Sequence, residues 1–96
     1  RNSHYDVCME ELESSLAAPG RAEDPCEAKE LAAAIEDFLD TLTKENRVIF
    51  MRRYWYADSL ADIAALLGLT ENGVSIRLTR TRRQLKTYLA EQGVLA

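Results

Sequence analysis

Seven side chains between Asn72 and Lys86 are suited to contact nucleic acid, and their spacing places them on one face of a helix. At about 100° per residue they form a wedge that is small and polar at its start and basic further along. Its members are Asn72, Ser75, Ile76, Thr79, Arg80, Arg83 and Lys86. Short polar side chains can bond base edges in the DNA major groove, while cations hold the surrounding phosphates. The alternative is a solvated charge face on an amphipathic helix.

The opposite side of the same segment is apolar, which predicts that it faces a protein core. Its members are Val74, Leu78, Thr81, Leu85, Tyr88 and Leu89. We therefore expect one long helix that packs on the rest of the chain and presents its polar side outward. After Leu89 the chain is expected to fray into a loose terminus.

A shorter helix with clear boundary residues precedes the long one. Its apolar stripe consists of Leu60, Ile63, Ala64 and Leu67. Ser59 is suited to cap its start, with Asp62 at the third helical position, and Gly68 is suited to end it in a left-handed conformation. Thr70 can then cap the long helix. Two helices joined so closely predict a helix-turn-helix, and this hairpin favours DNA reading over a merely solvated face.

Two more helices are predicted upstream of this hairpin. Asp24 and Pro25 form a strong start signal, an N-cap followed by proline at the first helical position, and the helix should end near Thr41. Its apolar stripe comprises Ala28, Leu31, Ile35, Phe38, Leu39 and Leu42. Thr43 can cap the next helix, which carries apolar residues on more than one side and should therefore lie wedged between neighbours.

The helix after Thr43 combines apolar and basic residues. Its two apolar stripes are Ile49, Phe50 and Tyr54, and Val48, Met51 and Trp55. We expect the aromatic side chains to pack in the core rather than to stack on bases. Arg52 and Arg53 could bind a DNA phosphate. The alternative for one of them is an ion pair with an acidic neighbour such as Asp58 or Asp62.

The first 25 residues are less strongly specified. Tyr5, Cys8, Met9, Leu12 and Leu16 have helical spacing, and Pro19-Gly20 begins a stretch of turn and linker composition. We predict an acidic linker or a short helix over residues 1–25, followed by one domain over residues 26–96. Because the chain begins with Arg1, we expect it to be a piece of a longer protein.

The charge is polarised along the chain. The formal net charge is −4 over 96 residues, but residues 1–46 carry four cations and twelve anions, whereas residues 47–96 carry eight cations and four anions. A basic half can meet phosphate while the acidic half points away from DNA or toward a basic partner. The alternative is that the acidic residues simply keep helix surfaces soluble.

Several functional classes are disfavoured by composition. No apolar run is long enough to span a bilayer, so we expect a soluble, cytoplasmic chain without membrane contact. Cys8 and Cys26 lack a Cys-x-x-Cys arrangement and have only His4 beside them, which argues against a disulfide framework or a metal site. The absence of a nucleophile-and-base set and of a Gly-rich phosphate loop argues against an enzyme and against a bound cofactor.

Three runs of this chain together resemble a known family. They are Leu42–Tyr56, Ser59–Leu69 and Val74–Leu85. They look like region four of bacterial RNA polymerase sigma factors of the sigma-70 family, and the short extracytoplasmic-function-type members are the nearest match. The resemblance covers about residues 27–90 and is most specific from Arg53-Tyr54 through Ile63-Ala64 to Arg77–Arg82. The resemblance implies that the chain is a C-terminal fragment of such a factor.

The resemblance implies an all-α, four-helix helix-turn-helix domain, related to winged-helix proteins but without a wing. It implies recognition of the minus-35 element of double-stranded promoter DNA by the long helix. Ser75, Ile76, Thr79 and Arg80 fall where the family reads bases, and Arg77 falls where it braces the backbone. With the residues chosen above, the predicted DNA contacts are Arg53, Thr70, Asn72, Ser75, Ile76, Arg77, Thr79, Arg80 and Arg83.

The resemblance also implies two protein partners, the flap of the RNA polymerase beta subunit and, as a further candidate, an anti-sigma factor. Two other functions stay open. One is the DNA-binding effector domain of a response regulator, whose four-helix form has similar central helices. The other is a helical protein-interaction module that does not bind DNA. For such a module, neither the salt concentration nor the DNA sequence would change the result of a DNA-binding measurement.

Overall fold

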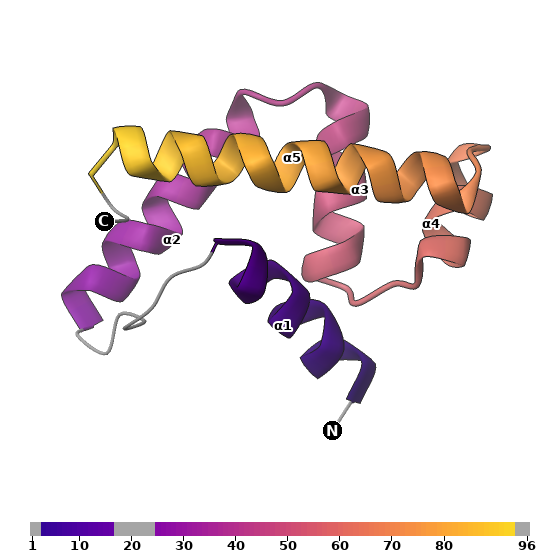
Figure 1. Cartoon of the computed structure of the whole chain (residues 1–96), viewed down its shortest axis with the longest axis horizontal. Helices are drawn as coiled ribbons and strands as arrows, with labels where there is room; N and C mark the ends of the chain where they lie inside the picture. The colour runs from indigo at the N-terminus through magenta and orange to yellow at the C-terminus, as the bar shows by residue number, and fades with distance from the viewer. Residues whose placement is uncertain (1–2, 17–24, 94–96) are drawn as a thin grey trace.

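The computed structural model describes residues 3–16 and 25–93, apart from the side chains of residues 3–6, 9, 13 and 25–28. Over these ranges the chain forms five helices (Figure 1). They are α1 (Ser3–Leu16), α2 (Pro25–Asp40), α3 (Lys44–Tyr54), α4 (Leu60–Leu67) and α5 (Glu71–Glu91). The molecule is flat, with extents of 39 × 31 × 17 Å. The predicted all-α helix-turn-helix fold is confirmed.

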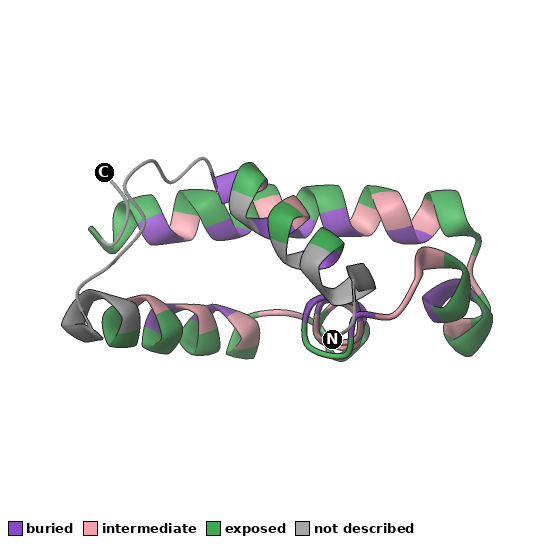
Figure 2. Cartoon of the chain, turned by 90° about the horizontal axis from the view of Figure 1, so that it is seen from below, coloured by how far each residue is buried: buried purple, intermediate pink, exposed green. Residues whose placement is uncertain are grey.

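The long helix α5 is the element around which the others pack. It contacts each of the other four helices, and it runs along the long axis of the molecule in Figure 1. Figure 2 shows its buried bands turned toward the other helices and its exposed bands along the outer edge. Its buried residues are Val74, Leu78, Thr81, Leu85 and Leu89. The predicted apolar wedge therefore faces the core, as its helical spacing requires.

The other helices complete one core under α5. Their buried apolar residues are Cys8, Leu12 and Leu16 of α1, Ala34 and Phe38 of α2, Ile49, Phe50 and Tyr54 of α3, and Ile63 and Ala64 of α4. Aromatic rings join elements here, because the rings of Phe38 and Tyr88 lie 5.5 Å apart between α2 and α5. None of the described helices is long and apolar enough to cross a bilayer.

The predicted ends of α2 and the start of α3 are confirmed. α2 begins at Pro25 and ends at Asp40, one residue before the expected end. Thr43 caps α3, and its hydroxyl accepts the amide hydrogen of Asn46 at 3.2 Å. The expected cap Asp24, the turn at Pro19-Gly20 and the last three residues of the loose terminus lie outside the described residues.

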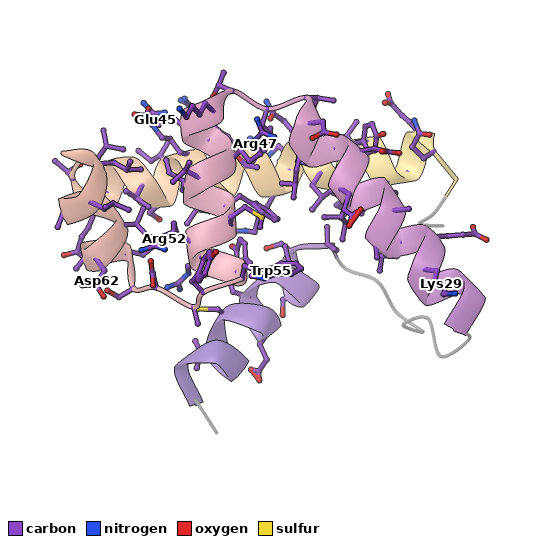
Figure 3. The ribbon with its side chains drawn as sticks, turned by 180° about the vertical axis from the view of Figure 1, so that it is seen from behind. Lys29, Glu45, Arg47, Arg52, Trp55 and Asp62 are labelled. Carbon is purple, nitrogen blue, oxygen red and sulfur yellow. The ribbon has the colours of Figure 1, made fainter. Side chains whose placement is uncertain are left out.

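The prediction that Trp55 packs in the core is wrong. Its side chain is 71% exposed, and the neighbouring Tyr56 is 59% exposed; Figure 3 shows Trp55 at the end of α3. The helix ends at Tyr54, and the buried Ala57 then takes a positive φ of 59° that turns the chain toward α4. The helical stripe therefore stops one residue before Trp55, and Val48 and Met51 are only half-buried.

Helix α1 is part of the same core, although its sequence specified it only weakly. Leu12 and Leu16 are buried against the rest of the protein, and α1 contacts both α3 and α5. Apolar burial at these positions stabilises the helix more than its own propensity does. That residues 26–96 form a domain by themselves stays a prediction.

Candidate nucleic-acid interface

The short helix α4 has the boundaries that its sequence predicts. The Ser59 hydroxyl accepts the amide hydrogen of Asp62 at 3.1 Å, which satisfies one of the free donors at the helix start. Gly68 closes the helix in the left-handed conformation, with φ 70° and ψ 32°. The amide of Leu69 then donates to the carbonyl of Ala64 at 2.9 Å, so the turn between the two helices is tied back to α4.

The start of α5 is fixed by a second capping bond. The hydroxyl of Thr70 accepts the amide hydrogen of Gly73 at 2.9 Å, so Thr70 is the N-cap, as predicted. A Cβ atom at position 73 would lie 3.1 Å from this hydroxyl oxygen, so glycine leaves room for the cap. The first turn of α5 is thereby closed directly after the turn that follows α4.

The outward side of α5 carries the residues predicted to contact DNA; we call this side the α5 face. Its exposed members are Asn72, Ile76, Thr79, Arg80, Arg83 and Lys86, and Ser75 is half-buried among them. The opposite residues Val74 and Leu85 are fully buried. The helix therefore presents its polar and basic side to the solvent, the orientation that a helix needs to enter a major groove.

Three cations on the α5 face are available to phosphates. Arg80, Arg83 and Lys86 are exposed and form no ion pair within the described part of the chain. Arg77 differs, because its guanidinium lies 2.7 Å from a Glu45 carboxylate oxygen and donates to the Asn46 side chain at 3.1 Å. Its charge is thus already shared with the start of α3, whereas the other three are not compensated.

The centre of the α5 face offers small and apolar groups. The Thr79 hydroxyl donates to the Ser75 carbonyl at 3.0 Å and accepts from Arg82 at 3.4 Å, which leaves its methyl group and one acceptor lone pair for a ligand. Ile76 is 43% exposed, and it lies one helical turn before Arg80. An exposed isoleucine and a threonine methyl group are suited to contact the C5-methyl group of thymine.

Arg53 lies away from this face, which revises its predicted role. Its side chain is 8% exposed, and its Nη2 atom lies 3.1 Å from a Glu11 carboxylate oxygen of α1. Its Nη1 donates to the Asp58 carbonyl at 3.1 Å. Because these bonds bury and occupy the guanidinium, Arg53 anchors α1 and is not positioned to hold a phosphate. Arg52, the other candidate, pairs with Asp58 at 2.9 Å, which is the alternative left open by the sequence.

Glu11 and Arg82 are functional candidates that sequence patterns alone did not single out. Arg82 falls between the buried wedge and the α5 face, and its Nη1 lies 3.2 Å from the Glu11 carboxylate. Burial acts to raise the pKa of Glu11, but hydrogen bonds from Arg53 and Tyr54 and the nearby arginine charges lower that pKa below its usual value. Burial and the bond to Glu11 raise the pKa of the Tyr54 hydroxyl. Only the fold brings these residues together, since Glu11 and Arg82 are 71 positions apart.

The described residues hold no group of three or more His, Cys, Asp or Glu side chains placed to bind a metal ion. The α5 face instead gathers polar and basic side chains at the surface. These groups can bond base edges and phosphates.

Comparison with known protein families matches residues 32–85 to Sigma-70, region 4. No curated protein and no solved structure matches the chain. The matched range runs from α2 through most of α5, and it contains every member of the α5 face except Lys86. It covers more than half of the chain, and the fold over this range is the helix-turn-helix described above. The chain therefore belongs to the sigma-70 region 4 family of DNA-binding domains.

Proposed function

We propose that this chain recognises the minus-35 element of bacterial promoters as part of an RNA polymerase sigma factor, and so directs transcription initiation. The observation that carries the proposal is the α5 face, which is polar and basic and turned to the solvent on a helix whose other side packs in the core. Ser75, Ile76, Thr79 and Arg80 would read base edges in the major groove. Thr70, Asn72, Arg83 and Lys86 would position the helix on the sugar-phosphate backbone.

Membership in the sigma-70 region 4 family supports two kinds of partner, promoter DNA and RNA polymerase. The polymerase contact would be made to the flap of the beta subunit, and an anti-sigma factor is a further candidate partner. The exposed pair Trp55 and Tyr56 supports a protein contact, because large aromatic side chains often anchor interfaces. In this role the domain would act in the cytoplasm.

The proposal is tested by selecting binding sites from a library of random DNA duplexes with the parent chain. We expect one short element to be enriched, and we expect labelled duplexes carrying it to bind more tightly than scrambled ones in fluorescence anisotropy. In Arg80→Ala, loss of a base contact should cost about 1–3 kcal/mol on the selected element and relax the preference at that position.

Lys29→Ala is the matched control, because Lys29 is an exposed cation on α2 at a distance from α5 (Figure 3). It changes the net charge by the same amount and should keep the preference of the parent. A library without any enriched element, together with binding that does not respond to salt, would contradict the proposal and favour a protein-interaction module.

A further inference from the structure

A polar cluster fastens α1 to the two helices beneath it, and Glu11 is its only carboxylate among the described residues. Glu11 accepts hydrogen bonds from Arg53 of α3 at 3.1 and 3.4 Å and from Arg82 of α5 at 3.2 Å. The Tyr54 hydroxyl also donates to Glu11 and accepts from Arg82 at 2.6 Å. One acidic side chain of α1 therefore holds two arginines that belong to other helices.

The end of α1 lies against the flank of the α5 face. Ser15 of α1 lines a shallow hollow whose other walls are Thr79, Arg82, Arg83 and Lys86 of α5. Two of these four residues are exposed cations of the α5 face, and Thr79 is one of its central members. A DNA backbone that follows the face toward its basic end would therefore run close to α1.

Arg82 connects this cluster to the α5 face. Its Nη1 atom bonds Glu11 and Tyr54, while its Nη2 atom donates to the Thr79 hydroxyl at 3.4 Å. The side chain is 16% exposed, so its charge is directed toward α1 rather than toward the solvent. A phosphate near Thr79 would attract the same guanidinium that Glu11 now holds. The same phosphate would be repelled by the Glu11 carboxylate, since both groups are negative.

We propose that α1 is an acidic arm that competes with duplex DNA for Arg82, so that docking of α1 and binding of DNA oppose each other. This inference rests on the proposed DNA-binding function, and it adds a regulatory role for a helix outside the matched family range. Anything that draws α1 away would free Arg82 to join the three cations of the α5 face. By linkage, bound DNA would loosen α1 to the same extent that docked α1 weakens DNA binding.

The comparison of Glu11→Gln with Glu10→Gln tests this competition. Glu10 is an exposed neighbour on the same helix and forms no ion pair within the described chain, so both variants remove one negative charge but only Glu11→Gln weakens the cluster. We expect Glu11→Gln to bind the selected duplex about two- to fivefold more tightly than Glu10→Gln, the range of a partly exposed ion pair. Its dependence on salt should also steepen by about one phosphate contact.

Equal affinities of the two variants would overturn the inference alone, because long-range repulsion would then explain the whole effect. Weaker binding by Glu11→Gln would also overturn it, since α1 would then assist DNA binding. If the parent, Glu10→Gln and Glu11→Gln all fail to bind any duplex, the proposed function fails and this inference fails with it.

Amide hydrogen exchange on the unmodified chain tests the same coupling without relying on a variant that still folds. Saturation with the selected duplex should speed exchange over residues 7–16 of α1, while residues 30–40 of α2 keep their rates. Slower exchange in α1, or unchanged exchange there while the first turns of α5 become protected, would overturn the inference.

Discussion

The number of cations on the α5 face determines how steeply DNA binding should fall with salt. Arg80, Arg83 and Lys86 are exposed and unpaired within the described chain, whereas Arg77 and Arg82 are held by carboxylates. Arg80 is assigned to base edges, which leaves Arg83 and Lys86 for phosphates. Each neutralised phosphate contributes about −0.9 to the slope of log affinity against log salt, so these two contacts give a slope of about −1.8. Between about 50 and 200 mM salt the parent should lose about 12-fold in affinity.

The variant Arg83→Ala removes one of these contacts. Its slope should be about −0.9, and its affinity should fall about 3.5-fold over the same range of salt. Fluorescence anisotropy of one labelled duplex across a salt series measures both slopes. Lys29→Ala serves as the control, and it should keep the slope of the parent because its charge lies on α2. A slope of Arg83→Ala equal to that of the parent, or a slope of Lys29→Ala as shallow as that of Arg83→Ala, would show that Arg83 does not contact a phosphate.

Three further predictions concern stability and packing. Arg53→Ala should lower the free energy of unfolding by about 1–3 kcal/mol in urea titration, because it leaves Glu11 without its main partner; an unchanged unfolding midpoint would show that the cluster adds nothing. Gly68→Ala should destabilise the fold by about 1–2 kcal/mol, since position 68 needs a positive φ, and Gly93→Ala, near the end of the chain, should cost less. Glu11 is surrounded by Arg53 and Tyr54 of α3, Arg82 of α5 and Cys8 of α1, and its partners lower its pKa. Its ionised form therefore stabilises the fold above the usual glutamate pKa of about 4.3. This stabilisation is lost as the pH falls through the lower pKa of the folded state. Urea titrations of the parent and Glu11→Gln across acidic pH should therefore converge, and a constant difference between them down to low pH would contradict the assigned cause.

The helix-turn-helix could be predicted from sequence because its signals are local. Ser59, Gly68 and Thr70 each act within three or four residues of themselves, through a capping bond or a backbone conformation. The buried wedge of α5 was equally accessible, since helical spacing alone places Val74 and Leu85 on one side. The exposed α5 face follows from the same geometry.

The errors arose where the fold overrides local pattern. Trp55 continues an apolar stripe in the sequence, but the helix ends one residue earlier and leaves the side chain in solvent. Arg53 is a residue type that often binds phosphate, but its guanidinium pairs with the Glu11 carboxylate of α1, 42 positions away. No periodicity within either segment records such a distant partner. The docking of α1, and with it the cluster around Glu11, therefore required the three-dimensional arrangement.

The central claim is that the α5 face enters a groove of duplex DNA, and backbone amide shifts measured by NMR test it most directly. On titration of the ¹⁵N-labelled chain with the selected duplex, the largest shift changes should fall between residues 70 and 86, along α5 and its capping turn. Smaller changes should reach α1 through Arg82. The claim is contradicted if the largest changes gather around Trp55 and Tyr56 while the amides of α5 keep their shifts at saturating DNA.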